Sequence, residues 1–217
     1  MRLRLLLSCT ALGIIASGCA LETVIRGNGH VVSESRSVTG FHAVSLSGTG
    51  LLRLRQTGTE SLILEAESNI LPNIETRSDD GRLNLRPNPG TRLESTLPIV
   101  YTLTVKSVDG LTVSGSGSTD AIDLDNDTLE VILSGSGSVT TAGTVGRQDI
   151  KVSGSASYRA DSLRSQDVAI TVSGAGGAVV HAVRTLDAQV SGSGSVEYVG
   201  APLLTKQISG SGSIRQR

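Results

Sequence analysis

The chain is poor in aromatic residues: its 217 residues include one Phe, three Tyr and no Trp. A compact β-sandwich usually fills its core with larger rings, so this composition disfavours such a fold. Apolar residues at helical spacing are also missing beyond the first residues of the chain, and no helical domain is expected. The length suits one domain.

Cysteine and excess charge are equally scarce. Cys9 and Cys19 are the only cysteines, and no second cluster of ligands accompanies them, which disfavours a disulfide framework, a redox site and a metal site. Without residues 1–18 the chain keeps 17 Lys and Arg against 20 Asp and Glu, a net charge of −3. No basic stripe or aromatic platform is present, so nucleic acid is not an expected partner.

The N-terminus has the layout of an export signal. Two arginines precede an apolar run, Leu5–Ile15, which is too short for a membrane span. Ala16-Ser17-Gly18-Cys19 follows and resembles the end of a bacterial lipoprotein signal, although Ala16 stands where such signals more often carry Leu. We expect a signal peptide over residues 1–18, lipidation at Cys19 and a short tether over 19–26. Ordinary signal cleavage is the alternative.

Ala20 follows the cysteine in place of Asp. By resemblance to the sorting rule of many Gram-negative lipoproteins, this favours the outer membrane. The predicted location is therefore the cell envelope, after export, with a lipid anchor.

What the chain does contain is a short repeated phrase of Val, Ser and Gly. Val-Ser-Gly-Ser-Gly-Ser at Val113–Ser118 recurs in variants whose first serines are 18 to 20 residues apart. The variants lie at Leu133–Ser138, Val152–Ser157, Val172–Gly177, Val190–Ser195 and Ile208–Ser213. A period in this range is typical of stacked repeats, in which each repeat buries its apolar face against its neighbours.

Each phrase ends a run of alternating aliphatic residues, such as Leu129-Val131-Leu133. This alternation places the aliphatic residues on one face of a strand and the intervening Ser and Thr on the other. The glycines then allow a tight corner, since Gly adopts backbone angles closed to other residues and lets stacked backbones approach closely. The predicted corner glycines are Gly115, Gly117, Gly135, Gly137, Gly154, Gly174, Gly192, Gly194, Gly210 and Gly212.

Short strand-like segments follow the corners, so each repeat is predicted to hold two short strands, a Gly-Ser corner and a return turn. Stacked repeats of this kind form an all-β, parallel β-helix with two or three sheets. Flexible linkers and phosphate-binding loops are the alternatives, but the even spacing, the aliphatic frame and the lack of a following Lys or helix disfavour both. The residues predicted to stack inward are Val113, Leu133, Val152, Val172, Val190 and Ile208.

Residues 27–107 are less regular, and we expect them to form the N-terminal rungs below the regular rungs of 108–217. Val44–Gly50 looks like an earlier version of the corner phrase. Further motifs follow a fixed order: Gly27-Asn28-Gly29, Arg36, Phe41, Leu46-Ser47-Gly48, Gln56-Thr57-Gly58, Asn69-Ile70-Leu71 and Gly81-Arg82-Leu83.

This order, together with the corner phrases, resembles the autotransporter-adhesin head GIN domain family of exported bacterial proteins. The resemblance covers about residues 27–215. It implies a right-handed β-helix with Gly-Ser-Gly at tight turns between sheets, and a role in adhesion. It brings no catalytic set.

No catalytic, cofactor or metal site stands out. His30, His42 and His181 lie far apart and lack metal-ligand spacing. One acidic cluster lacks the Gly of a calcium loop and is expected to be a solvated return turn; it consists of Asp120, Asp123, Asp125, Asn126, Asp127 and Glu130. β-Helical polysaccharide lyases and hydrolases place acids and bases together on one sheet face, and the residues that could do so here are Arg159, Asp161, Arg164, Asp167, Arg184 and Asp187.

These observations predict a non-catalytic cell-envelope lipoprotein, a β-helix module for adhesion, surface binding or structure. The alternative is a carbohydrate-active enzyme, which an acidic and basic cluster in a groove on one sheet face would favour. Expected partners are the membrane, through the lipid, and a glycan or another envelope protein; the oligomeric state stays open. Polar ladders for weak, multivalent contacts are predicted from Ser114, Ser116, Ser134, Ser136, Ser153, Ser155, Ser191, Ser193, Ser209 and Ser211.

Overall fold

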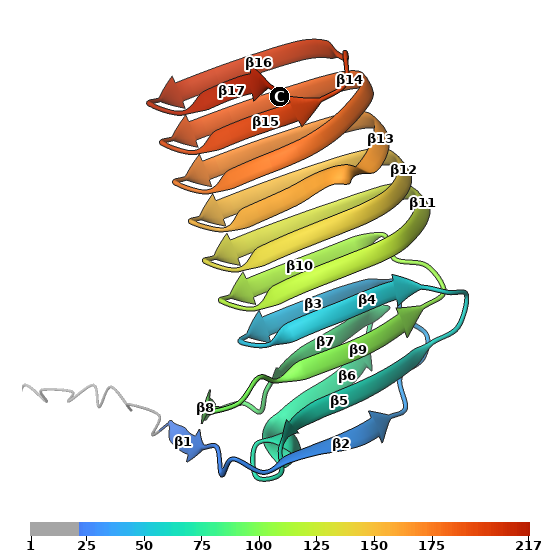
Figure 1. The fold of residues 1–217 in the computed structure, drawn as a ribbon, viewed down its shortest axis with the longest axis vertical. Coiled ribbons are helices and arrows are strands. Elements are labelled where there is room, and N and C mark those ends of the chain that lie inside the picture. The colour runs from blue at the N-terminus through green and yellow to red at the C-terminus, as the bar shows by residue number, and fades with distance from the viewer. Residues whose placement is uncertain (1–21) are drawn as a thin grey trace, which may run out of the picture.

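The computed structural model describes residues 22–217, which form a parallel β-solenoid (Figure 1). The predicted signal peptide and Cys19 lie outside the described residues. Within them, the one helical element is a single 3₁₀ turn, η1 (Leu71–Asn73). The predicted β-helix fold is confirmed.

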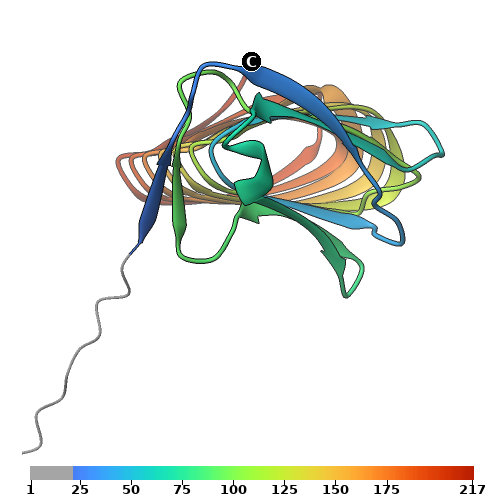
Figure 2. The same cartoon turned by 90° about the horizontal axis from the view of Figure 1, so that it is seen from below.

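Long strands form the regular coils. They are β11 (Ser118–Gly135), β12 (Ser138–Gly154), β13 (Ser157–Gly174) and β14 (Gly177–Gly192), and each pairs in parallel with the next. Below them lies β10 (Gly110–Gly115), and above them lie β15 (Ser195–Val199), β16 (Leu203–Gly210) and β17 (Ser213–Gln216). The coils form a flattened tube, seen end-on in Figure 2.

The predicted return turn is wrong for these coils. Each long strand passes from one Gly-Ser corner to the next without a break, so two short strands are merged into one. Bulges absorb the bend, for example between Ala121 and Leu124 in β11 and between Thr140 and Ala142 in β12. A bulge adds curvature while the ladder on either side of it stays paired, and a turn is therefore unnecessary.

The coil below β10 and β11 comes from a distant part of the sequence. β3 (Ala43–Gly48) pairs with β10, with Ser47 opposite Ser114, and β4 (Leu51–Gln56) pairs with β11. Val44–Gly50 thus forms a corner of the same stack, as its similarity to the phrase predicted. β7 (Arg82–Pro87) and β9 (Val100–Val105) form the next coil down, beside β3 and β4.

Residues 57–109 are therefore an excursion that builds the N-terminal end before the chain returns to the stack. β5 (Ser61–Glu67) pairs antiparallel with both β9 and β2 (Val31–Arg36), and β6 (Ile74–Asp79) forms a hairpin with β7. β1 (Thr23–Arg26) pairs with β8 (Thr91–Glu94). η1 lies across the end of the tube in Figure 2, and Ile70, Leu71 and Ile74 around it are buried.

A buried carboxylate anchors this cap. Glu67 is fully buried and accepts hydrogen bonds from the backbone N–H of Gly29 (2.6 Å) and from the hydroxyl and N–H of Thr96 (2.6 and 2.8 Å). The Thr96 hydroxyl, aided by the backbone donors, lowers the pKa of Glu67. A Cβ at Gly27 would lie 2.0 Å from the Glu67 carboxylate, so a larger residue there would displace this carboxylate from its hydrogen bonds.

Asn69 and Arg36, from two further N-terminal motifs, belong to the same cap. Asn69 accepts from the N–H of Asn28 (3.1 Å) and donates to the carbonyl of Arg26 (2.6 Å). Arg36 donates to the carbonyls of Ile74 (2.5 Å) and Leu71 (2.8 Å), which ties β2 to η1. The motifs whose order carried the family resemblance are thus structural.

The predicted inward column is confirmed for five of its six residues. Val113, Leu133, Val152, Val172 and Val190 are paired in register and at most 2% exposed. Ile208 continues the register but is 43% exposed. Its burial was wrongly predicted because no further rung among the described residues covers β16.

The core also contains a hydrogen-bonded polar network inside the tube. The hydroxyl of Tyr158 donates to Gln148 (3.0 Å) and lies 3.0 Å from the Thr141 hydroxyl, and Gln148 donates to Ser165. All four side chains are buried. Burial raises the pKa of Tyr158, so the phenol stays neutral and its partners satisfy it. The composition predicted a purely aliphatic core, and the core in fact also contains these four polar side chains.

The two glycines of a corner have different roles. The first has φ between 85° and 112° in all six phrases, and a Cβ on Gly154 would lie 2.6 Å from the carbonyl oxygen of Gly135. The second glycine has an ordinary φ, and its place is taken by Ala156 in one corner. The first position therefore requires Gly on two grounds, backbone angle and space.

Gly154→Val should lower the free energy of unfolding by about 1–3 kcal/mol or more, because it combines strain with a clash against the next coil. Chemical denaturation measures the effect. Ser155→Val, at the exposed neighbour in the same corner, is the control and should change the midpoint little. An unchanged midpoint for Gly154→Val would mean that the corner is a tolerant loop.

The last rung carries a charge on its core-facing side. Lys206 of β16 pairs in register with the fully buried Ala188, between the inward positions of Leu204 and Ile208. Gln216 of β17 stands on the same rung and donates to the carbonyl of Gly200 (2.7 Å). Inward-pointing charges on edge strands oppose pairing with another chain.

Lys206→Leu should therefore increase association between copies of the chain, since the last rung would then present an uninterrupted apolar row. Light scattering after size exclusion, over a range of concentrations, measures it. Lys206→Arg keeps the charge and should behave as the unaltered protein does. Equal mass for the Leu variant and the unaltered protein would contradict a protective role for Lys206.

Candidate functional site

One outer face of the solenoid carries a column in which ionisable residues recur. On the strand segments that follow the corners, every second residue points outward. The third residue after the corner forms one such column, which the register aligns in the order Asp120, Thr140, Arg159, Val179, Glu197 and Arg215. The charged side chains of this column thus face solvent on the sheet that follows the corners.

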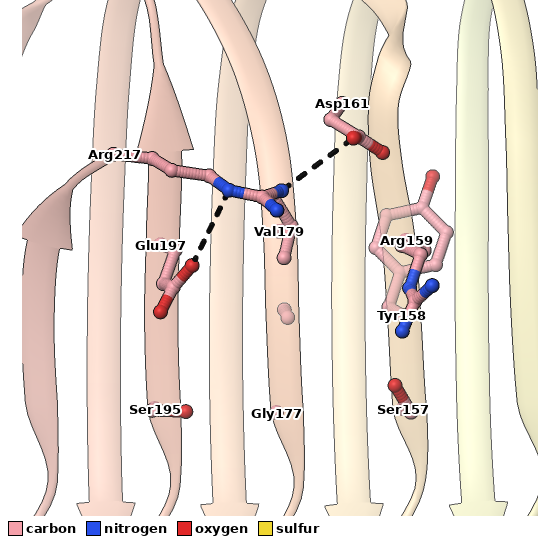
Figure 3. Close-up of a pocket in the computed structure, with 10 residues that line it drawn as sticks. Ser157, Tyr158, Arg159, Asp161, Gly177, Val179, Ser195, Glu197 and Arg217 are labelled. Atoms are coloured by element: carbon pink, nitrogen blue, oxygen red, sulfur yellow. Dashed lines mark ion pairs between the residues drawn. The ribbon is translucent and has the colours of Figure 1, made fainter.

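A depression of about 310 Å³ interrupts this face between Arg159, on β13, and Glu197, on β15 (Figure 3). We call it the Arg159 depression. Between these two residues, the outward positions of β14 are occupied by Gly177, which has no side chain, and by Val179, whose side chain is short. The lining is completed by Ser157, Tyr158, Asp161, Ala178, Ser195 and Arg217.

Arg217 connects the two carboxylates of the depression. In Figure 3 its guanidinium group lies between Glu197 and Asp161, over the strand that carries Val179. Its Nη1 is 3.5 Å from Asp161 and its Nε is 3.9 Å from Glu197. Glu197 also accepts hydrogen bonds from Arg215, and these, with the charges of both arginines, lower its pKa.

These contacts define what the depression can do chemically. A carboxyl group must carry a proton at working pH to act as a general acid, which usually requires a raised pKa. Glu197 has the opposite shift, and Asp161 faces a guanidinium group. The arrangement suits recognition of a polar ligand through hydrogen bonds and charge more than proton transfer.

The sequence analysis named two of the four charged residues of this cluster, without grouping them. Of the six acids and arginines considered for one sheet face, the structure brings Arg159 and Asp161 together. Asp167 instead pairs with Arg184 outside the depression, where Arg184 and Thr185 lower the Asp167 pKa to about 2. Arg164 and Asp187 are not part of the depression either.

Glu197 and Arg217 were missed, although the repeat contains the signal that identifies them. Arg159, Val179 and Glu197 each stand two residues after the last position of a corner phrase, at 157, 177 and 195. Asp161 and Arg217 stand four residues after theirs, at 157 and 213. Counting residues from the end of each corner phrase would have placed Arg159 and Glu197 in one column, and Asp161 and Arg217 in another.

The acidic cluster of β11 is dispersed around the bend. Asp123, which has φ 59°, pairs with Arg55 (3.1 Å), and Glu130 pairs with Lys151 (3.1 Å). The four aspartates of the cluster are exposed, as predicted, but they lie along strand β11 and not in the predicted return turn. Across residues 22–217, no group of three or more His, Cys, Asp or Glu side chains could hold a metal ion.

The three histidines are separate in space as well. His42 lies 2.8 Å from Asp109, whereas His30 belongs to the cap and His181 to β14. In the part of the chain that the structure describes, no helix is long and apolar enough to cross a membrane.

The predicted serine ladders lie on the surface. Ser114 and Ser134 are half-buried, and the other eight serines of the predicted set are exposed. Ser114 donates to Ser47 across neighbouring coils (3.1 Å), and Ser138 donates to Ser118 (3.0 Å). The corner edge therefore presents rows of hydroxyl groups along the solenoid.

Comparison with known proteins adds the family. The model described as "Putative auto-transporter adhesin, head GIN domain" matches residues 40–202. The chain belongs to this family. The match confirms the resemblance predicted from the motif order and the corner phrases of the GIN domain. No curated protein matches the chain.

Solved structures share the fold of this GIN domain. A "putative adhesin" from Bacteroides fragilis is 21% identical, with a TM-score of 0.74, over 89% of this chain and 100% of that chain. A "putative adhesin" from Parabacteroides merdae is 17% identical, with a TM-score of 0.56, over 90% and 99%. A "putative lipid binding protein" from Parabacteroides distasonis is 21% identical, with a TM-score of 0.57, over 90% and 100%. Identities at this level show the fold alone.

Proposed function

We propose that this GIN domain is a non-catalytic contact module of the cell envelope, anchored by lipid at Cys19 and binding a glycan or another envelope protein. The observation that carries the proposal is the charge pairing in the Arg159 depression. Its two carboxylates face Arg217, and hydrogen bonding from Arg215, with the charges of both arginines, lowers the pKa of Glu197. Such groups bind polar ligands well and transfer protons poorly.

The surface outside the depression supports the same role. Exposed hydroxyl groups repeat along the corner edge with the spacing of the coils, about 4.8 Å. Single contacts of this kind are weak, but many copies on one membrane raise the overall strength of binding. Membership of a family described as adhesin head domains agrees with this interpretation.

A carbohydrate-active enzyme is the second candidate, because one observation favours it. Arg159, Asp161, Glu197 and Arg217 do form an acidic and basic cluster in a depression on one sheet face. Such a cluster is the feature that, on the sequence alone, was expected to favour an enzyme over a binding module. The direction of the Glu197 pKa shift weighs against it.

Incubation of purified protein with a polysaccharide panel that includes pectins and alginates separates the two candidates. We expect no cleavage, because both carboxylates of the depression face guanidinium groups and the pKa of Glu197 is lowered, whereas a general acid usually requires a raised pKa. Release of reducing ends or unsaturated products is the measurement. Reproducible cleavage that disappears in Asp161→Asn or Arg159→Gln, but persists in Arg164→Gln, would establish the enzyme and overturn the proposal.

Cys19→Ala should release the protein from membranes, because the acyl chains that hold it by hydrophobic burial would be missing. Fractionation of cells that express either form, followed by a high-salt wash, measures the effect. Cys9→Ala, within the predicted signal, is the matched control and should stay in the membrane fraction. A Cys19→Ala protein that remains bound after the wash would contradict lipid anchoring.

A further inference from the structure

We propose that the Arg159 depression binds one carboxylated sugar unit of an acidic polysaccharide, with the guanidinium group of Arg159 paired to the sugar carboxylate. The inference rests on the proposed function, since it names the class of glycan that the non-catalytic surface contacts. Shape, charge and hydrogen-bonding capacity each support it.

The shape follows from two short residues in columns that carry longer side chains in the adjacent coils. Gly177 stands where those coils have Ser157 and Ser195, and Val179 stands between Arg159 and Glu197. Since the coils are about 4.8 Å apart, a gap two coil steps wide lies between β13 and β15, on the outer side of β14. Its volume, about 310 Å³, lies at the lower end of small-ligand pockets. The space suits a single sugar ring.

The pairing of charges in the depression favours an anion beside Arg159. Arg215 and Arg217 are engaged by the carboxylates of Glu197 and Asp161. Arg159, in contrast, forms no ion pair within 4.0 Å among residues 22–217. Both carboxylates of the lining are thus engaged, and the guanidinium group of Arg159 is left without a carboxylate partner within the described part of the chain. A ligand carboxylate supplies the missing partner, because the planar guanidinium group can donate two parallel hydrogen bonds to it.

The remaining polar groups match the hydroxyl groups of a sugar. Asp161 and Glu197 offer acceptor oxygens, and Ser157 and Ser195 can donate or accept. Arg217 keeps donor capacity, since its contacts to the two acids are long, at 3.5 and 3.9 Å. An inorganic anion would use Arg159 alone, whereas a ring with several hydroxyl groups would use the whole lining.

The test compares trisaccharides that differ only at the carboxylate. The unaltered protein is titrated with trimannuronate and mannotriose, and with trigalacturonate and galactotriose, in matched linkages. Amide resonances locate the site and calorimetry gives the affinity. We expect at least one uronate to bind about tenfold more tightly than its neutral counterpart, the gain of one charge-assisted hydrogen-bond pair. The largest shifts should lie at Gly177 and Val179.

Two matched pairs of variants identify the residues involved. Arg159→Gln should weaken uronate binding about tenfold and leave the neutral sugar unaffected, while Arg164→Gln removes the same charge from the same strand outside the depression and should change neither. Val179→Gln fills the depression without a change of charge and should reduce uronate binding. Thr171→Gln, an exposed residue on the opposite sheet, should not.

Three results would overturn the inference: equal affinity for acidic and neutral sugars, equal loss with Arg159→Gln and Arg164→Gln, or displacement by citrate as effective as by the trisaccharide. Failure of both uronates to bind at millimolar concentration would also overturn it, and the non-catalytic function would stand. Cleavage of polysaccharide would instead overturn the non-catalytic function, whatever the affinity of the depression.

Discussion

Close approach of successive backbones at the corners is the constraint on which the rest of the solenoid depends. The place of a Cβ at Gly135, Gly154, Gly174 or Gly192 is occupied by the carbonyl oxygen of the glycine in the coil below. That same oxygen accepts a hydrogen bond from the residue after the glycine, as between Ser155 and Gly135 (2.9 Å). The corners therefore fix both the spacing and the register of the coils. Inward and outward side chains alternate along the strands on both sides of each corner. A slip of the pairing by one residue would therefore expose the whole inward column.

A stack held together by contacts between neighbours has two ends, and this protein treats them differently. At the N-terminal end, residues 57–109 leave the stack, form a coil below it and return. The cap so formed buries Ile70 and Leu71 under η1 and encloses the Glu67 carboxylate among backbone donors. At the other end, the last described rung exposes Leu203 and Ile208, and Lys206 occupies a core-facing position. One end is closed by packing, and the other is protected by charge.

The regular coils could be predicted because their determinants are local. A glycine with positive φ and aliphatic residues at every second position repeat in each phrase, so Val113 to Val190 were placed correctly. The excursion could not be predicted, because the pairing of β3 with β10 spans about sixty residues and is encoded only by the similarity of Val44–Gly50 to the later phrases. The network around Tyr158 was missed for another reason. A register shift next to Ser165 changes the alternation, so the pattern alone does not place Ser165 inward. Gln148 does follow the alternation, in register with the buried Leu129 and Val168, but it is polar and an inward row identified by its aliphatic residues leaves it out.

The candidate site arises where the repeat is broken. Identical coils would present the same residue at each level of a column, and the outer face would be uniform. Here Gly177 and Val179 are short between coils that carry Arg159 on one side and Glu197 on the other, so a depression with opposite charges on its walls forms between them. Outward positions can vary in this way without loss of stability, because the corners and the inward column hold the coils. A solenoid of this kind can therefore change its ligand by substitution in one outer column while its core and its corners stay the same.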